Sequence, residues 1–332
     1  MAEEKFTYEN LDSETNDLLL KYFTTPFRTG YIKCKGYVLP EYFREFGDRI
    51  RQMEIRDDDI WVCSFPKTGT TWTQEMVWCI GHNADLETAK EFLPRRFPFL
   101  EHSPLFDYRN LTANNPEIKF PPYVMDSIDY INKLPSPRFI KAHVPFELLP
   151  DKLQNYSTQA KIVYVARNPR DTCVSYYHHC KLLEGYKGPF DKFAQLFLEG
   201  NITFGPFFNH IKGYWKQRNN PNVLFLKYEE MKQDLKSVIY KTADFIEKSI
   251  DEEDVEKLLD HLSFSSMKVN RAVNYEPVIE INKKYKLIEE DGSFMRKGEI
   301  GEWKETMDSD LCERFEKWEK ENLDEIDFTF SI

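Results

Sequence analysis

The segment Ser64–Trp72, which reads SFPKTGTTW, combines residue types that can bind phosphate. It follows the apolar run Ile60–Phe65, which predicts a buried strand, and it opens the predicted helix Thr70–Ile80. At such a junction, backbone N–H groups and the positive end of the helix point at an anion. Gly69 permits a tight turn and Lys67 supplies a positive charge, while hydroxyl donors come from Thr68, Thr70 and Thr71. The spacing predicts a phosphate site, although an ordinary strand–turn–helix junction has the same order of elements.

The order of residues in this loop differs from that of the P-loops that hold magnesium. In those loops Lys follows the last Gly directly, and the Ser or Thr that binds the metal comes next. Here Lys67 precedes Gly69, and Thr70 occupies the position of the Lys. The loop therefore predicts phosphate binding with no metal required. The same order disfavours a kinase-type phosphotransferase, which is the alternative enzyme class.

A second predicted strand, Arg138–Val144, carries Lys141 and His143. Because alternate residues of a strand share a face, these two side chains are expected on the same side. Open α/β sheets bind ligands at the carboxyl ends of their strands, and a neutral His placed there can take a proton from a hydroxyl group. The alternative, a half-buried histidine with a structural role, stays open at this point.

Two further basic segments are candidates for phosphate binding. The first places Arg167 at the end of a predicted strand, and Ser175 follows about two turns into the next helix. Arg suits phosphate because its planar guanidinium can donate two parallel hydrogen bonds. The second, Arg296–Lys304, combines cations and glycines in a flexible loop. Taken alone, Arg167 could form a surface ion pair, and the second segment could be a solvated loop.

These residues need a scaffold, and the sequence alternates apolar β-rich runs with longer helical stretches. This alternation predicts an α/β fold with a central parallel sheet flanked by helices. The predicted strands are Ile60–Phe65, Arg138–Val144, Lys161–Ala166 and Val223–Lys227. The predicted helices are Thr70–Ile80, Pro169–Leu183, Phe190–Glu199, Phe207–Arg218, Glu229–Lys248, Glu252–Leu262 and Ser309–Glu321.

Local signals mark two helix starts and two long loops. Asn168 is expected to cap the helix that follows it, and Ser249 with Glu252 matches a capping box. The segments Glu91–Pro122 and Asn270–Gly301 lack clear periodicity and are rich in aromatic or basic residues. We expect both to be long functional loops over a site.

Composition limits the class of protein. The 332 residues carry a net charge of −11, which argues against an extended nucleic-acid surface. The start, Met1–Phe6, is acidic and polar with no signal-peptide core, and no apolar run is long enough to cross a bilayer. The six cysteines lack CxxC spacing, so they are expected to be reduced thiols without a zinc framework. We therefore expect one domain spanning residues 1–332, a cytoplasmic location, and neither nucleic acid nor a membrane as partner.

The basic segments together resemble the cytosolic sulfotransferase family over most of the chain. The family's first nucleotide loop reads close to TYPKSGTTW and is similar to Ser64–Trp72. Its lysine–histidine strand matches Lys141–His143, and its RNPxD…S stretch matches Arg167–Ser175. Its terminal RKGxxGxWK loop matches Arg296–Lys304, and its KYE-type segment matches Lys227–Glu229.

The resemblance implies a single-domain, P-loop NTPase-like sulfotransferase fold and the donor 3′-phosphoadenosine 5′-phosphosulfate (PAPS), with 3′-phosphoadenosine 5′-phosphate (PAP) as product. By position, the 5′-phosphosulfate is expected at Lys67, Thr68, Gly69, Thr70 and Thr71. The nucleoside is expected at Trp72, Tyr228, Ser263 and Phe264. The 3′-phosphate is expected at Arg167, Ser175, Arg296, Lys297 and Gly298. The implied catalytic residues are His143 as the base, with Lys67 and Lys141 beside the transferred sulfonate.

Three departures from the family pattern are present. Ala142 stands where the family usually has Thr between the Lys and the His, and Leu262 stands where Thr often precedes the Ser–Phe pair. Many relatives also carry a C-terminal KxxxTVxxxE dimer motif. Counted from Lys304, this chain has Asp308 and Ser309 in place of its Thr and Val. A homodimer formed through that segment is therefore in doubt.

The expected activity is direct, in-line transfer of the sulfonate to the hydroxyl of a small hydrophobic phenol or alcohol. Sulfonation of an allylic alcohol followed by elimination, a net dehydration, also stays open. An apolar acceptor pocket is expected from the aromatic residues Phe97, Phe99, Phe106, Tyr108, Tyr123 and Tyr177. A non-enzymatic nucleotide carrier is the alternative from another class. A Golgi-type enzyme for glycans is disfavoured because no membrane anchor is evident.

Overall fold

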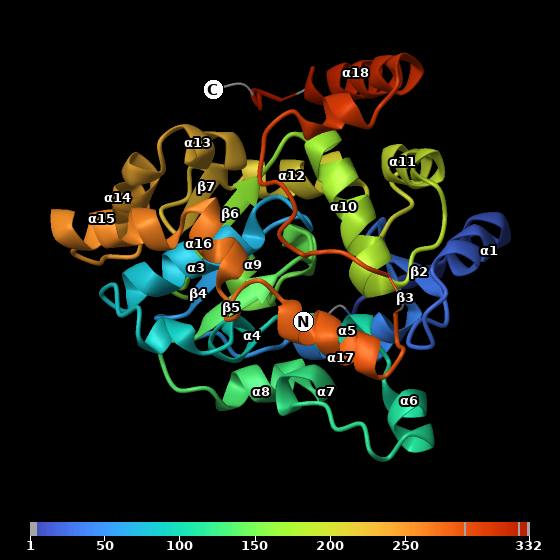
Figure 1. The fold of residues 1–332 in the computed structure, drawn as a ribbon, viewed down its shortest axis with the longest axis horizontal. Coiled ribbons are helices and arrows are strands. Elements are labelled where there is room, and N and C mark those ends of the chain that lie inside the picture. Colours follow the sequence, from blue (N-terminus) through green and yellow to red (C-terminus); the bar gives the residue numbers. More distant parts are fainter. Residues whose placement is uncertain (1–4, 289, 325, 331–332) are drawn as a thin grey trace.

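The four predicted strands form one parallel sheet in the computed structural model, which describes residues 5–288, 290–324 and 326–330 (Figure 1). They are β4 (Ile60–Cys63), β5 (Phe139–Ala142), β6 (Lys161–Ala166) and β7 (Val223–Lys227), in the spatial order β5-β4-β6-β7. The register places Val62 of β4 beside Lys141 on one side and Val163 on the other. Lys141 therefore lies next to the strand that leads into the SFPKTGTTW loop.

Residues of the sheet alternate between two apolar cores. Trp61 and Cys63 belong to one core, whereas Ile60 and Val62 belong to the other. The first core is completed by α10 (Pro169–Glu184), α11 (Phe190–Leu198) and α12 (Phe207–Trp215). The second is completed by α3 (Thr70–Gly81), α14 (Leu235–Phe245) and α15 (Glu252–His261). Helices thus cover both faces of the sheet, which explains the nearly continuous apolar character of its strands.

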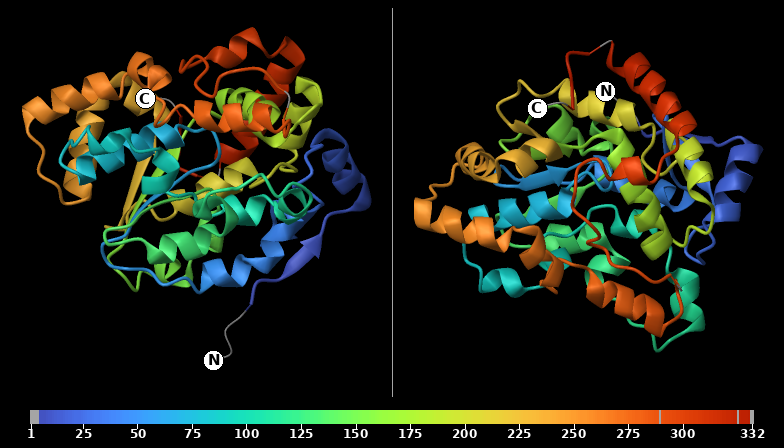
Figure 2. Two further views of the ribbon diagram at one scale, coloured as in Figure 1. Left: turned by 60° about the horizontal axis from the view of Figure 1, so that its bottom comes forward. Right: turned by 45° about the horizontal axis from the view of Figure 1, so that its top comes forward.

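The remaining helices lie around this arrangement, with α1 and the pair α14–α15 at opposite ends of the molecule (Figure 2). The other α-helices are α1 (Ser13–Tyr22), α2 (Gly47–Arg51), α4 (Leu93–Arg96), α5 (His102–Leu105), α6 (Arg109–Asn114), α7 (Pro122–Met125), α8 (Ser127–Lys133), α9 (Asp151–Gln154), α13 (Tyr228–Gln233), α16 (Phe264–Val269), α17 (Glu276–Lys284) and α18 (Ser309–Leu323). The 3₁₀ turns are η1 (Glu41–Glu45), η2 (Thr88–Lys90), η3 (Phe146–Leu148) and η4 (Glu302–Glu305).

Two predicted strands are shorter than expected. The strand from Ile60 ends at Cys63, where the chain turns into the phosphate-site loop. The strand predicted over Arg138–Val144 ends at Ala142, because the N–H groups of His143 and Val144 bond to the carboxylate of Glu101 and not to a neighbouring strand. The ends of both strands are thus diverted into the candidate site.

The helix predictions need two corrections. The single helix predicted over Glu229–Lys248 is two helices, α13 and α14, because the Asp234 side chain accepts a hydrogen bond from the N–H of Ser237 and starts a new helix. The capping box predicted at Ser249 is also wrong, since the cap of α15 is Asp251, which accepts from the N–H of Asp254. The Asn168 cap of α10 is confirmed.

An antiparallel sheet near the N-terminus was not predicted. It consists of β1 (Tyr8–Asn10), β2 (Tyr31–Cys34) and β3 (Tyr37–Pro40) in the order β1-β2-β3. The two segments expected to be long loops also contain helices, namely α4, α5 and α6 in the first and α17 in the second. Within the described part of the chain, no helix is long and apolar enough to span a membrane, and all six cysteines are free thiols.

Candidate active site

The SFPKTGTTW loop has a strained, compact backbone. Lys67 and Gly69 both adopt left-handed conformations, with φ of 69° and 106°. A Cβ atom on Gly69 would lie 2.8 Å from Cδ2 of Tyr228, so glycine is needed for its backbone freedom and for its lack of a side chain. A left-handed lysine is uncommon, and such strain gathers at ligand-binding loops. Helix α3 begins immediately afterwards at Thr70, so its N-terminus faces the space enclosed by the loop.

The threonines of this loop differ in what their hydroxyls do. Thr68 Oγ1 donates within the fold to the carbonyls of Phe65 and Val165, each at 2.9 Å. The Thr68 hydroxyl is therefore used within the fold and is not directed at a ligand. Thr70 Oγ1 lies 2.6 Å from Ser64 Oγ, and both Thr70 and Thr71 line a cavity.

This cavity has a volume of about 550 Å³ and brings together most of the predicted site residues. Those that line it are Lys67, Gly69, Thr70, Thr71, Trp72, Lys141, His143, Arg167, Ser175, Tyr228, Ser263, Phe264, Arg296, Lys297 and Gly298. Of the residues predicted to bind the donor or to take part in catalysis, only Thr68 lies outside this lining. Residues up to 231 positions apart in the sequence, from Lys67 to Gly298, thus share one enclosed space.

Two lysines that line the cavity have lowered pKa values. Burial, with help from the nearby Lys141 and Arg167, lowers the pKa of Lys67 to about 7. Burial also lowers the pKa of Lys141 to about 8. Each ammonium group lies against an aromatic face, Lys67 Nζ at 3.7 Å from the Phe294 ring centroid and Lys141 Nζ at 4.3 Å from that of Phe99. A bound anion would favour the charged form of both.

His143 is fixed in one tautomer. Its Nδ1 lies 2.7 Å from the carbonyl oxygen of Ser64, and a carbonyl oxygen can only accept, so Nδ1 must carry the proton. The neutral ring therefore has its free lone pair on Nε2. Burial and then the charge of Lys141 hold the pKa of His143 well below its usual value, so the ring is neutral near pH 7. A neutral, oriented imidazole that lines a cavity can act as a general base.

Glu101 holds the backbone at this histidine. Its Oε1 accepts from the N–H groups of His143 and Val144, at 3.0 and 2.7 Å. Burial raises the pKa of Glu101 to about 7. On the other side, His210 Nε2 lies 2.8 Å from the carbonyl oxygen of His143. Neither partner was predicted from the sequence, because each is defined only by its contact across the fold.

Arg167 connects the first loop to the C-terminal basic loop. It donates to the carbonyl of Lys67 at 3.4 Å and to that of Glu299 at 2.8 Å, and its guanidinium lies 4.4 Å from the Tyr228 ring centroid. Asp171, in the first turn of α10, accepts from the N–H groups of Gly301 and Trp303. In Figure 1 the segment between α17 and α18 passes between α16 and α10. The basic loop is thus tied to the start of α10.

The cations of the C-terminal loop have acidic partners. Arg296 pairs with Glu302, and Lys297 Nζ lies 2.6 Å from Glu305 Oε2. Burial and the charge of Arg167 lower the pKa of Arg296. The positive charges of Arg296 and Arg167 therefore repel each other, and a bound anion would reduce that repulsion.

Three aromatic residues form a slot beside the loop. Trp72 and Tyr228 meet edge to face, with ring centroids 5.6 Å apart. The Trp72 indole N–H donates to the carbonyl of Leu262 at 2.9 Å, and the Tyr228 hydroxyl donates to that of Gly298 at 3.0 Å. Phe264 is 37% exposed and packs so closely on Gly298 that a Cβ there would lie 2.4 Å from its ring. This geometry suits a flat, stacked base.

The other half of the cavity is mainly aromatic. Five of the six predicted acceptor residues line it: Phe97, Phe99, Phe106, Tyr108 and Tyr123. Tyr177 does not, because it packs against Tyr186, Phe190 and Phe193. Polar groups that the sequence analysis missed also line this half: His102, His178, His179 and Glu184. Glu184 Oε2 pairs with Arg28 at 2.5 Å, and its Oε1 lies 3.4 Å from His179 Nε2.

Comparison with known proteins agrees with this geometry. A family model described as Sulfotransferase domain matches residues 57–327. The chain is 43% identical over 95% of its length to luciferin sulfotransferase of Photinus pyralis, covering 85% of that protein. It is 32% identical to sulfotransferase 1E1 of Homo sapiens, over 89% of this chain and 94% of that one.

Solved structures agree as well. A structure of retinol dehydratase in complex with androsterone and the inactive cofactor PAP superimposes with a TM-score of 0.88 and 30% identity, covering 98% of each chain. A second structure of retinol dehydratase, with retinol and PAP, gives 0.86 and 31% over the same shares. These matches over nearly the whole length show that this chain belongs to the sulfotransferase family and is a PAPS-dependent enzyme that sulfonates small-molecule acceptors.

Proposed function

We propose that this enzyme transfers the sulfonate of PAPS directly to the hydroxyl of a small hydrophobic phenol or alcohol, with His143 as general base. The observation that carries the proposal is the His143–Ser64 contact, which leaves Nε2 as the unprotonated nitrogen in a cavity that also contains Lys67 and Lys141. Proton transfer to His143 Nε2 would accompany attack of the acceptor oxygen on sulfur. The sulfur–oxygen bond to the phosphate would break on the opposite side.

The donor is proposed to lie with its two anionic ends on two groups of cations. Lys67, Thr70 and Thr71 at the start of α3 would hold the 5′-phosphosulfate, together with backbone N–H groups of the loop. Arg167 and Ser175 would hold the 3′-phosphate, with Arg296, Lys297 and Gly298 on the other side. Trp72, Tyr228, Ser263 and Phe264 would enclose the nucleoside between them.

Charge stabilisation is proposed to come from the same lysines. As the bond to the phosphate breaks, negative charge would grow on the bridging oxygen, and Lys67 and the N-terminus of α3 would lie on that side of the donor. Support comes from the presence of both in the lining of the cavity. Lys141, one residue from the end of β5, would contact the transferring sulfonate. Preorganised charges of this kind often make the largest contribution to catalysis.

The acceptor is proposed to be apolar around its hydroxyl, because five aromatic side chains line its half of the cavity. A phenol fits this wall, and a relative at 43% identity is named for luciferin. A second candidate activity, net dehydration of an allylic alcohol through its sulfate ester, is favoured by the superposition on retinol dehydratase over 98% of the chain. In that case sulfate would leave with the bonding electrons, and a carbon-bound proton would be lost.

A single panel experiment tests the proposal. Phenols, sterols, amines, long-chain alcohols and an allylic alcohol would each be incubated with PAPS, and products identified by mass. Gain of a sulfonate on phenols or alcohols is the expected result, whereas loss of water from the allylic alcohol would indicate elimination. Donor binding with no turnover on any acceptor would point to a carrier, and transfer from ATP in place of PAPS would point to a kinase-type enzyme.

The proposal extends to where the enzyme is found in the cell and to how its chain is divided into domains. We infer a cytoplasmic enzyme in which the single domain spans residues 1–332. Support comes from the six free thiols, since thiols stay reduced in the cytosol. Fractionation of cells with an antibody against the chain would test the location.

A further inference from the structure

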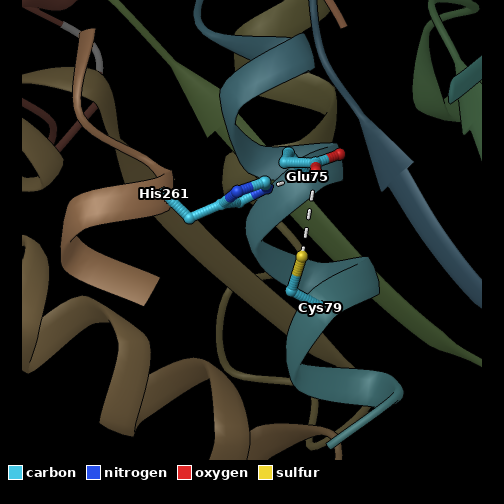
Figure 3. Close-up of side chains that lie close together, drawn as sticks. All are labelled: Glu75, Cys79 and His261. Carbon is cyan, nitrogen blue, oxygen red and sulfur yellow. Dashed lines mark hydrogen bonds and ion pairs between the residues drawn. The ribbon is translucent and has the colours of Figure 1, made fainter. Parts of the chain in front are cut away.

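A second cluster of reactive side chains does not line the cavity described above. Figure 3 shows its three members, Glu75, Cys79 and His261, close together. Glu75 and Cys79 are one turn apart on α3, and His261 is the last residue of α15. His261 Nε2 lies 2.7 Å from Glu75 Oε1, and Cys79 Sγ donates to the same oxygen at 3.8 Å. All three potential ligand atoms lie within 4.8 Å of one another.

The surroundings of the cluster hold the Glu75 carboxylate in a fixed orientation. Glu75 and Cys79 are fully buried, while the His261 side chain is 14% exposed and gives access from one side. The second carboxylate oxygen of Glu75, Oε2, accepts from Arg96 Nη2 at 2.5 Å. Arg96 also donates to the backbone carbonyls of Ala89 and Glu91. Outer partners of this kind fix the orientation of a metal-binding carboxylate.

The three ligands are of the types that zinc prefers. Thiolate sulfur, imidazole nitrogen and carboxylate oxygen bind Zn²⁺ at about 2.0–2.3 Å in tetrahedral sites. Calcium and magnesium prefer oxygen ligands alone. A site with one thiolate, one carboxylate and one neutral imidazole also balances the double charge of the ion, and Arg96 remains paired with Glu75 Oε2.

We propose that Glu75 Oε1, Cys79 Sγ and His261 Nε2 bind one zinc-like divalent cation, with water as the fourth ligand. On binding, the Cys79 thiol would release its proton to solvent. The proton that His261 Nε2 donates to Glu75 Oε1 would also leave that nitrogen, so that the neutral ring carries its proton on Nδ1 and Nε2 is free for the metal. The hydrogen bond between His261 and Glu75 would thus be replaced by two bonds to the metal. The site is separate from the sulfonate-transfer reaction, because none of its three ligands lines the active-site cavity.

The position of the site gives the ion a structural consequence. Helix α3 carries Thr70, Thr71 and Trp72, and the chain after His261 carries Leu262, whose carbonyl accepts the Trp72 indole N–H. The ion would therefore join α3, which carries Trp72, to the end of α15, directly before the Leu262 carbonyl that holds the Trp72 indole.

Cobalt is the probe for the test, since Co²⁺ replaces Zn²⁺ in such sites and a cobalt–thiolate bond absorbs in the near ultraviolet. The full-length protein, reduced and freed of metals with a chelator, would be titrated with Co²⁺ and then with Zn²⁺. We expect one equivalent of Co²⁺ to give a sulfur-to-cobalt charge-transfer band that Zn²⁺ removes. Zn²⁺ should also raise the melting temperature by mass action.

Two variants assign the band. Cys79→Ser should abolish it and the zinc-dependent rise in melting temperature, whereas Cys312→Ser, at the one cysteine that is not fully buried, should leave both unchanged. His261→Gln alters a partly exposed side chain and provides a second test should Cys79→Ser fold poorly; it should weaken cobalt binding and shift the visible bands. Three results would contradict the proposal: no band in the wild-type protein, a band that persists in Cys79→Ser, or a band that is unaltered in His261→Gln. Any of them would show that the cluster is only a buried hydrogen-bonded ion network.

Discussion

At the scale of single residues, the role of His143 depends on which ring nitrogen carries the proton. The contact of Nδ1 with the Ser64 carbonyl fixes that choice and leaves Nε2 unprotonated, as the proposed role of general base requires. Replacing His143 by Ala should lower kcat by about 10²- to 10⁴-fold, the usual contribution of a general base, and leave PAP affinity nearly unchanged. Steady-state kinetics and calorimetric titration with PAP would measure the two effects. Near-normal turnover of this variant would rule out His143 as the base.

Replacing Arg167 should weaken donor binding and have little effect on kcat, the opposite of the result expected for His143. Removing a charge-assisted phosphate contact costs about 1.5–3 kcal/mol, which corresponds to about a 10- to 100-fold rise in the donor's KM for Arg167→Ala. The preference for PAPS over the analogue without the 3′-phosphate should fall by a similar factor. The kcat at saturating donor should change much less. An unaltered preference between the two donors would refute the assignment of Arg167 to the 3′-phosphate.

The lowered pKa values of Lys67 and Lys141, about 7 and about 8, predict that nucleotide binding takes up protons. The bound anion favours both ammonium groups and raises their pKa values, so near pH 8 the protein should gain protons when PAP binds. PAP affinity should correspondingly fall as the pH rises from about 7 to 9, because deprotonation of the empty site then competes with binding. Calorimetry in two buffers of different ionisation enthalpy measures the protons exchanged. Lys67→Met should reduce the uptake, and no exchange in the wild type would mean that both lysines are charged in the empty cavity.

At the scale of elements, the junction between β4 and α3 depends on Gly69. Gly36 offers a matched control, because it also has a positive φ, 83°, but a Cβ there would meet nothing within 4 Å. A left-handed alanine costs about 1–2 kcal/mol, so Gly69→Ala and Gly36→Ala should both lower the melting temperature. Only Gly69→Ala should raise the donor's KM, because its methyl group would push the Tyr228 ring out of the slot. Thermal melts and donor kinetics compare the two, and equal KM values would mean that Tyr228 moves without consequence.

Sequence patterns predicted the strands of the parallel sheet better than those of the antiparallel sheet. The four strands of the parallel sheet are mostly apolar, and their positions were correct to within two residues at each end. The antiparallel sheet escaped prediction because β1 has only three residues, none of them buried, and because Lys33, Lys35 and Gly36 interrupt the apolar run that contains β2 and β3. The break at Asp234 escaped because the helical pattern continues across it, and only the contact with the Ser237 N–H shows where one helix ends and the next begins.

At the scale of the whole molecule, the convergence of the site follows from the parallel sheet. Strands that run in one direction end at one edge, so Lys67, Lys141 and Arg167 had to lie close together once their strands were assigned. Contacts made across the fold decided the rest. Packing turned Thr68 Oγ1 toward Val165 and Tyr177 toward Phe190, and no local pattern signals either orientation.

The surface at the position of the family's dimer motif bears on whether the protein is a monomer or a dimer. The residues around the family's dimer motif present charge in place of an apolar patch, since Asp308 and Ser309 are exposed and the one apolar side chain between Lys304 and Asp308, Met307, is turned inward. An interface without an apolar centre is weak, so the protein should sediment as a monomer at micromolar concentration. The double variant Asp308→Thr with Ser309→Val completes the motif that ends at Glu313 and should shift the protein toward a dimer; Thr can still cap α18 as Asp308 does through the Leu311 N–H. Sedimentation velocity over a range of concentrations distinguishes the two states. If the wild-type protein is a dimer, and a charged residue substituted for Ser309 does not dissociate it, then the subunits meet through another face.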